Sequence, residues 1–247
     1  GREACAVGRK KREWPLFFLC LSAALYGLAL IFSATRYEET LHGLVGKQAV
    51  ALGGGVVLCL LLSVLDVRKL LEKLWWLLPV VNVGLLLLLV PLGNDDGTGN
   101  KSWISLPGGG FNLQPAEVVK ISFLLLLALQ LRKLGEKGLN RPKAVFLLLL
   151  HVLALCALLY GVSGDIGMVA VYLAVYLVML WSAGVHPLWL LGEVAAGVGA
   201  VVLLWPRLPE YVRMRFLVVF DHGLDPLGKG FQQERSLLAI GSGQVTG

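Results

Sequence analysis

Long apolar runs separated by short polar segments dominate this sequence. A bilayer core of about 30 Å requires roughly 20 apolar residues in a helix. Seven runs reach or approach that length: 14–35, 44–65, 74–92, 115–131, 144–162, 166–184 and 188–206. The pattern therefore predicts an all-α, polytopic membrane bundle with about seven transmembrane helices in this chain. We expect residues 1–247 to form a single membrane domain.

The composition favours a membrane protein over a soluble or disordered one. Of the 247 residues, 57% are hydrophobic and 15% are charged, and the mean hydropathy is +0.75. Soluble domains average about 45–50% apolar and about 25% charged residues. A chain this apolar would not stay solvated as a disordered polymer. Collagen is excluded because the 30 glycines have no three-residue period.

The basic residues predict an orientation. The formal net charge is +6, but Lys and Arg cluster in short segments between the apolar runs, as at 9–12, 68–73 and 132–143. This distribution favours a membrane surface as partner and disfavours nucleic acid. If the spans alternate, these segments share one side, which the positive-inside rule assigns to the cytoplasm together with the N-terminus. The external side then holds loop 93–113 and tail 207–247.

The tail departs from the charge rule, because several of its basic residues would be external. Long translocated loops escape the positive-inside bias, so the predicted topology survives. A cationic external segment favours an anionic partner such as a lipid phosphate. We therefore expect Arg213 and Arg215 to meet phosphate or headgroups. The chain begins with Gly1 and ends at Gly247 within a polar, glycine-rich stretch, which indicates a fragment of a longer protein.

Two places combine ionisable residues with apolar helices. Asp165 lies at the outer start of run 166–184, where it is either a helix N-cap or a functional carboxylate, and one residue can do both. Near the start of run 115–131, Glu117 and Lys120 form an i,i+3 pair on one helix face. Such a pair neutralises a membrane-embedded ammonium locally. It either stabilises packing alone or lines a substrate cavity.

The sequence contains no motif for a bound cofactor or metal. Segment 97–102 lacks the glycine that a phosphate-binding loop requires directly before Lys101. The four cysteines are scattered singly, without a CxxC pair. A divalent cation that enters with a bound ligand would leave no trace of this kind.

The tail carries a long motif. Its residues fall in register on the pattern R-x-x-x-F-L-D-P-x-x-D-P-x-G-x-G-Y-Q-x-x-Q-S-x-x-A-I-G-S-G-G, with Phe231 at the Tyr position: Arg215, Asp221, Asp225, Pro226, Gly228, Gly230, Phe231, Gln232, Ser236 and 239–243. That pattern is the hallmark of the SEDS family (shape, elongation, division and sporulation; FtsW/RodA/SpoVE), which this chain resembles. Upstream, the resemblance includes Trp103, Pro115, Glu117, Lys120 and Asp165. Ala116, Gly164, Met168, His222 and Gln244 depart from it, so the subfamily stays open.

The resemblance implies a peptidoglycan glycosyltransferase. Such an enzyme polymerises lipid II, an undecaprenyl-pyrophosphate-linked disaccharide, into cell-wall glycan outside the bacterial cytoplasmic membrane. Its partner is a class B penicillin-binding protein. The family also implies about ten helices in the whole protein and a catalytic Asp beyond Gly247, further along the external loop that begins at 207. The 247 residues alone are therefore expected to be inactive.

Within this chain, the resemblance makes Asp165 the candidate catalytic residue. We expect Glu117, Lys120, Arg213 and Arg215 to bind the substrate, with Asp165 in the same outer cavity. Two other functions fit the same features. One is a lipid II flippase, and the other is a non-catalytic scaffold for a penicillin-binding protein.

Overall fold

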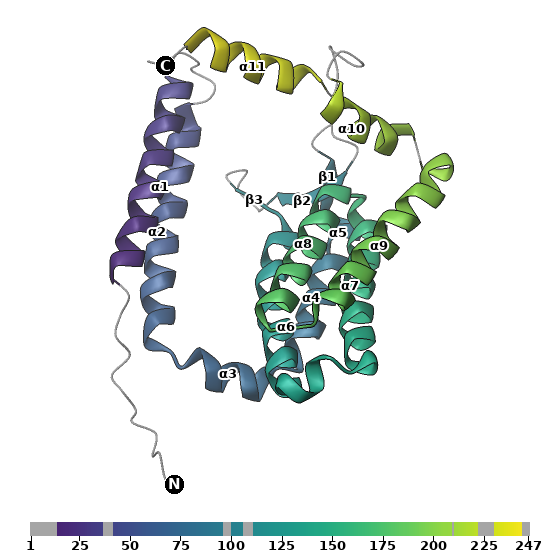
Figure 1. The fold of residues 1–247 in the computed structure, drawn as a ribbon. Helices are drawn as coiled ribbons and strands as arrows, with labels where there is room; N and C mark the ends of the chain where they lie inside the picture. The colour runs from purple at the N-terminus through teal and green to yellow at the C-terminus, as the bar shows by residue number, and fades with distance from the viewer. Residues whose placement is uncertain are drawn as a thin grey trace. The chain divides into compact units, whose positions relative to one another are not determined.

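The structure is a computed structural model that describes residues 14–36, 42–95, 100–105, 111–208, 210–221 and 230–243. The chain forms two compact units, Gly1–Gly184 and Val185–Gly247. Helices make up most of both units, in agreement with the predicted all-α membrane fold (Figure 1).

The first two apolar runs form a helix pair, α1 (Trp14–Thr35) and α2 (His42–Val64), which lie side by side (Figure 1). Large apolar side chains are exposed along both helices, among them Phe18 and Leu61. Helices that are apolar on all sides suit a lipid environment and not water. The exposed apolar surface of both helices is therefore suited to contact with lipid.

A short polar helix, α3 (Val67–Leu74), follows this pair. It begins at Asp66, whose carboxylate accepts a hydrogen bond from the Lys69 N–H at 3.4 Å. Glu72 of α3 forms a 2.7 Å ion pair with Arg132 of a later helix. These contacts hold α3 at the end of the bundle where the basic segments lie.

Five helices form the core of the first unit: α4 (Leu77–Leu87), α5 (Leu89–Leu92), α6 (Pro115–Leu139), α7 (Pro142–Ser163) and α8 (Ile166–Ser182). Their packed centre consists of fully buried side chains such as Phe123, Val152 and Tyr172. Polar side chains also join the helices. Asn82 of α4 accepts a hydrogen bond from Ser122 of α6, and His151 of α7 lies 3.0 Å from Gln130 of α6. Such bonds are typical of helices that pack within a membrane.

The predicted external loop 93–113 contains a small antiparallel sheet. Its strands are β1 (Gly93–Asp95), β2 (Lys101–Ser105) and β3 (Asn112–Leu113), in the order β1-β2-β3. Ile104 of β2 lies opposite Gly93 on one side and Leu113 on the other. β2 packs on α5, α6 and α7. Strands this short have no readable alternation of apolar and polar residues, so the sequence pattern did not reveal them.

The second unit contains the last predicted span and the tail. Its elements are α9 (Pro187–Leu204), the 3₁₀ turn η2 (Trp205–Arg207), α10 (Glu210–Phe220) and α11 (Phe231–Gly243). The tail was expected to be an external loop, yet two helices form within it. The motif residues Asp225, Pro226 and Gly228 lie outside the described residues.

Each of the seven predicted runs corresponds to helix. Within the described residues, four helical segments are long and apolar enough to cross a membrane by themselves: Trp14–Thr35, Gly43–Val64, Pro142–Ser163 and Pro187–Arg207. The apolar segments Leu77–Leu92 and Ile166–Ser182 are shorter. A polytopic membrane fold follows from this, while the count of seven spans stays a prediction.

Candidate functional site

Asp165 forms the link between α7 and α8. Gly164 ends α7 in the left-handed conformation, with φ of +70°, and its N–H donates to the Tyr160 carbonyl at 2.8 Å. Asp165 Oδ1 then accepts a hydrogen bond from the Met168 N–H at 3.1 Å. Asp165 is therefore the N-cap of α8, which confirms that interpretation of the sequence.

The second carboxylate oxygen of Asp165 faces the sheet. Oδ2 accepts a hydrogen bond from the Ser102 hydroxyl at 3.4 Å. Ser102 lies on β2 and is 5% exposed. Asn100 precedes β2 and is also buried. Its side-chain Oδ1 lies close to Gly164, only 3.5 Å from where a side chain at that position would begin. The sheet is thus seated directly on the α7–α8 link.

Asn100 and Ser102 were not predicted from the sequence to lie beside Asp165. Ser102 and Asp165 are 63 residues apart, and the contact depends on how the sheet is placed. A carboxylate offers about four lone-pair positions. The Met168 N–H and the Ser102 hydroxyl occupy two of them, so half-buried Asp165 keeps acceptor capacity for a ligand hydroxyl.

Glu117 and Lys120 form the predicted pair at the start of α6. Lys120 Nζ lies 2.9 Å from Oε1 and 2.8 Å from Oε2 of Glu117. The Lys120 side chain is 21% exposed and the Glu117 side chain 54%. The ammonium is thus partly buried and the carboxylate holds it with both oxygens. The structure confirms the pairing, and the choice between a packing role and a substrate role stays open.

The structure sets the level of these groups along the bundle. The Tyr172 hydroxyl of α8 donates to the Ala116 carbonyl of α6 at 2.7 Å. Both α6 and α8 begin at the end of the bundle where the sheet lies (Figure 1). Asp165 precedes Tyr172 by seven residues, which is about 10 Å along a helix. Asp165 therefore lies at the sheet end of the bundle. The Lys120–Glu117 pair lies about one to two turns farther from that end, because the Tyr172 side chain leans toward the start of its helix.

Asp165 and the Glu117–Lys120 pair do not contact each other. Glu117 and Lys120 contact one another, whereas the Asp165 carboxylate accepts hydrogen bonds from Ser102 and Met168. The Lys120 ammonium can hold an anionic phosphate, and the Asp165 carboxylate, nearer the sheet, can accept a hydrogen bond or a proton from a hydroxyl.

The two predicted arginines belong to α10 in the second unit. Arg213 is half-buried, and its Nε is buried without a hydrogen-bond partner among the described residues. The side chain of Arg215 lies outside the described part of the structure. The convergence of these arginines with Asp165 in one cavity stays a prediction.

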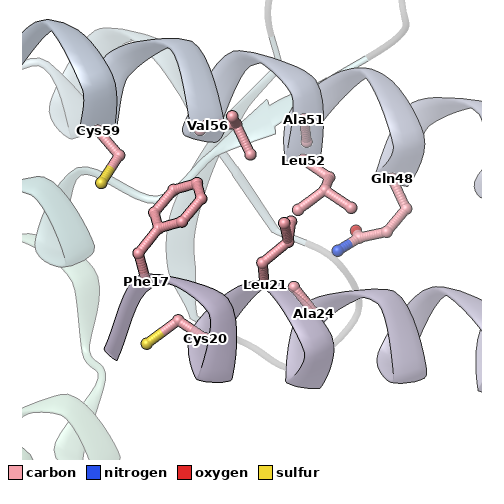
Figure 2. Close-up of a pocket in the computed structure, with 10 residues that line it drawn as sticks. Phe17, Cys20, Leu21, Ala24, Gln48, Ala51, Leu52, Val56 and Cys59 are labelled. Atoms are coloured by element: carbon pink, nitrogen blue, oxygen red, sulfur yellow. The ribbon is translucent and has the colours of Figure 1, made fainter. Parts of the chain in front are cut away.

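The apolar cavity between α1 and α2 offers different chemistry. It has a volume of about 360 Å³, and its lining includes Phe17, Cys20, Leu52, Gln48 and Cys59 (Figure 2). Its described lining contains no charged side chain, so it has nothing to balance a phosphate. Among the described residues, no three His, Cys, Asp or Glu side chains gather in a possible metal site.

Known proteins are similar to this chain in sequence. A family model described as "Cell cycle protein" (FTSW_RODA_SPOVE) matches residues 14–247. The probable peptidoglycan glycosyltransferase FtsW of Alcanivorax borkumensis is 30% identical over 247 residues, which cover 94% of this chain and 61% of that protein. The protein of the same name from Halorhodospira halophila is 37% identical over 167 residues, which cover 66% of this chain and 40% of that protein. The chain thus spans less than two thirds of the length of either relative.

Solved structures share the fold. A chain from the work described as "Structural coordination of polymerization and crosslinking by a peptidoglycan synthase complex" is 31% identical and superposes with a TM-score of 0.74. The match covers 94% of this chain and 66% of that chain. The rod shape determining protein RodA of Thermus thermophilus is 27% identical, with a TM-score of 0.60, and the match covers 78% of this chain and 59% of that chain.

Proposed function

Because this chain belongs to the FtsW/RodA/SpoVE family of cell cycle proteins, we propose that the protein polymerises lipid II into peptidoglycan glycan strands. The observation that carries this proposal is Lys120, a partly buried cation in an apolar helix that Glu117 holds with both carboxylate oxygens. Ionisable residues within membrane helices are costly and often mark the path or site of a substrate. The lipid pyrophosphate of lipid II is an anionic ligand that this cation can hold.

The reaction requires a base and a site for the departing phosphates. The 4-hydroxyl oxygen of one sugar attacks the anomeric carbon of another, and a C–O bond forms. The bond between that carbon and the pyrophosphate oxygen breaks, so the lipid pyrophosphate leaves with the electron pair. The hydroxyl proton passes to a carboxylate. Cations that hold the phosphates stabilise the charge that develops on them.

We assign each residue a role in that reaction. Lys120 holds the pyrophosphate, and Glu117 positions Lys120 and keeps its ammonium compensated before the substrate arrives. Asp165 at the outer mouth contacts the sugar hydroxyls and is our candidate for the catalytic carboxylate within this chain. Arg213 and Arg215 bind phosphate or lipid headgroups. The family's own catalytic Asp is expected beyond Gly247 and would complete the site.

We also propose a protein partner, and we expect that a metal ion can accompany the substrate. The solved structure with a TM-score of 0.74 comes from a peptidoglycan synthase complex in which polymerization and crosslinking are coordinated. By analogy we propose a class B penicillin-binding protein as the partner of this protein. A divalent cation bound to the pyrophosphate stays an expectation. Such an ion is held mainly by the phosphates, so it needs no dedicated protein ligands.

Glycan synthesis from purified components tests the proposal. The full-length protein, in detergent with its penicillin-binding protein, is incubated with lipid II, and the polymer is resolved on a gel. Lys120→Gln should reduce polymer at least about tenfold, because one phosphate-binding cation is lost. Lys69→Gln is the matched control, since Lys69 is also a cation in an i,i+3 pair, with Asp66, and is 84% exposed on α3.

The other outcomes identify the alternative functions. Transbilayer movement of lipid II without polymer would indicate a flippase. Stimulated crosslinking by the penicillin-binding protein, without either activity, would indicate a scaffold. Equal polymer from Lys120→Gln and from the unmodified protein would refute the role of Lys120. The 247-residue chain alone should produce no polymer.

A further inference from the structure

The ends of α6 and α7 opposite the sheet line a second pocket, which is open and cationic and is here named the α6–α7 pocket. Its volume is about 360 Å³. Three cations, Lys133, Arg141 and Lys143, and three apolar residues, Leu134, Ala144 and Leu147, line it. It lies at the far end of the bundle from Asp165, so the proposed polymerisation site does not use it.

A break in α6 creates this pocket. Gly135 adopts φ of +60° and ψ of 175° inside the helix, a conformation that a side chain would strain. The chain turns there and passes through buried Leu139 before Pro142 starts α7. Arg141 and Lys143 are consequently placed across from Lys133.

Among the described residues, the lining of the α6–α7 pocket carries positive charge only. Elsewhere at this end of the bundle, Arg132 is paired with Glu72 at 2.7 Å and Lys69 with Asp66 at 3.5 Å. In contrast, the described residues that line the pocket include no acid. Lys133 Nζ lies 4.5 Å from the centroid of the Trp75 ring, a contact that orients the ammonium without cancelling its charge.

The start of α7 adds to this charge. Arg141 is the N-cap residue of α7, and Lys143 is the second residue of the helix. A helix N-terminus carries a partial positive charge, so cations there are unfavourable unless an anion is present. Three exposed, like-charged side chains and a helix N-terminus therefore border the same pocket. A phosphate in the pocket would relieve all of these repulsions together.

The surroundings favour a ligand that also has an apolar part. α7 is one of the helices that can cross a membrane, over Pro142–Ser163. Leu147, which lines the pocket, is 52% exposed, and the neighbouring Phe146 is 62% exposed. The cations thus lie at the polar end of an apolar, lipid-facing helix surface. Basic pockets between helices at this depth suit the headgroups of anionic lipids.

We propose that the α6–α7 pocket binds the phosphate headgroup of an anionic phospholipid in the adjacent leaflet. Arg141, Lys143 and Lys133 contact the phosphate, and an acyl chain lies along α7 over Leu147. The positive-inside rule assigns this leaflet to the cytoplasm. The bound lipid would fix the connection between α6, which carries Glu117 and Lys120, and α7, which leads to Asp165.

Lipid retention measured by native mass spectrometry tests this proposal. The full-length protein is released from nanodiscs that contain equal amounts of phosphatidylglycerol and phosphatidylcholine. The unmodified protein should retain phosphatidylglycerol selectively. Arg141→Gln combined with Lys143→Gln should weaken that retention at least about tenfold, because each basic residue contributes about 1 kcal/mol to binding an anionic lipid.

Two further double variants control for charge and folding. Lys69→Gln with Lys73→Gln removes the same charge from α3, outside the pocket, and should retain the lipid. Arg141→Lys with Lys143→Arg keeps the pocket charge and should also retain it, even if the glutamine variant unfolds. Loss of lipid from the charge-preserving variant, or from the α3 variant to the same degree as from the pocket variant, would refute the proposal.

Two remaining arms identify the ligand. Excess inorganic phosphate should leave phosphatidylglycerol bound, since free phosphate lacks the contact with the α7 surface. Displacement by inorganic phosphate would show a site for soluble anions and would overturn the lipid assignment. Equal retention of phosphatidylcholine and phosphatidylglycerol, or equal retention by the glutamine variant and the unmodified protein, would overturn it as well.

Discussion

At Asp165, a helix cap and a candidate site carboxylate occupy the same side chain. Asparagine caps helices about as well as aspartate but carries no charge. Asp165→Asn should therefore keep the thermal stability of the protein and reduce polymerisation at least about tenfold. Asp165→Ala should lose activity and also about 1 kcal/mol of stability, because the bond from the Met168 N–H disappears.

Thermal unfolding in detergent and polymer yield from lipid II measure the two effects separately. Ser102→Ala is the control for the sheet contact, since it removes the 3.4 Å hydrogen bond and leaves both cap and charge. If Asp165→Asn keeps full polymerisation activity and only the destabilised Asp165→Ala variant loses it, then Asp165 acts only as the helix cap.

The Glu117–Lys120 pair allows the energy of a partly buried ion pair to be measured. In a double-mutant cycle of Glu117→Gln and Lys120→Gln, we expect a coupling of about 1 kcal/mol, at the upper end for accessible pairs, because Lys120 is only 21% exposed. The same cycle on Asp66 and Lys69, also an i,i+3 pair, should give about 0.3 kcal/mol or less.

Unfolding of the reconstituted protein by sodium dodecyl sulfate supplies the free energies for both cycles. A coupling at Glu117–Lys120 no larger than at Asp66–Lys69 would mean that burial adds nothing to the pair. In that case the partial burial of Lys120 would no longer support its role in binding an anion.

At the scale of elements, the α7–α8 link depends on one glycine. Gly164 has φ of +70°, so Gly164→Ala should destabilise the protein by about 1–2 kcal/mol and displace the cap at Asp165. Gly161, three residues earlier, is helical, and a Cβ there would meet nothing within 4 Å. Gly161→Ala should therefore be neutral or stabilising by up to about 1 kcal/mol.

Melting temperatures of the two alanine variants test this contrast directly. The prediction fails if both variants melt at the same temperature. Polymer yield should fall only for Gly164→Ala, since that substitution moves Asp165 relative to Ser102.

The helices were predictable from sequence because the signal is local to each apolar run. The Glu117–Lys120 pair was predictable for the same reason, since an i,i+3 spacing determines the contact. The hydrogen bond between Ser102 and Asp165 was not, because it joins segments 63 residues apart through strands too short to show a pattern. The extension of α6 to Leu139 was also missed, since its last turns carry charges typical of a loop.

The tail shows a different limit of sequence reasoning. Its motif identified the family, but motif residues such as Gly241 and Ser242 lie within α11, where glycine and serine favour turns by propensity alone. α10 and α11 have no strong apolar periodicity, so hydropathy did not indicate them. Whether Arg213 and Arg215 meet Asp165 depends on packing between distant segments, and neither periodicity nor spacing reports that.

At the scale of the whole molecule, every functional statement depends on which side of the membrane the sheet occupies. A polymerase that builds external glycan must have Asp165 and the sheet outside, and the positive-inside rule places them there. A cysteine at Asn112, on β3, should therefore react with a membrane-impermeant maleimide in intact spheroplasts. A cysteine at Lys69, which is 84% exposed on α3, should react only after the membrane is permeabilised. Both variants are made in a background without the native cysteines.

The labelling result has consequences for both proposals. The expected pattern places the Lys120 cation within reach of an external substrate, and it places the α6–α7 pocket in the cytoplasmic leaflet. The opposite pattern would leave the Asp165 site facing the cytoplasm, where it could receive lipid II but could not extend an external glycan strand. It would refute external polymerisation at this site, while the lipid pocket would survive in the other leaflet, since its chemistry requires only a membrane interface.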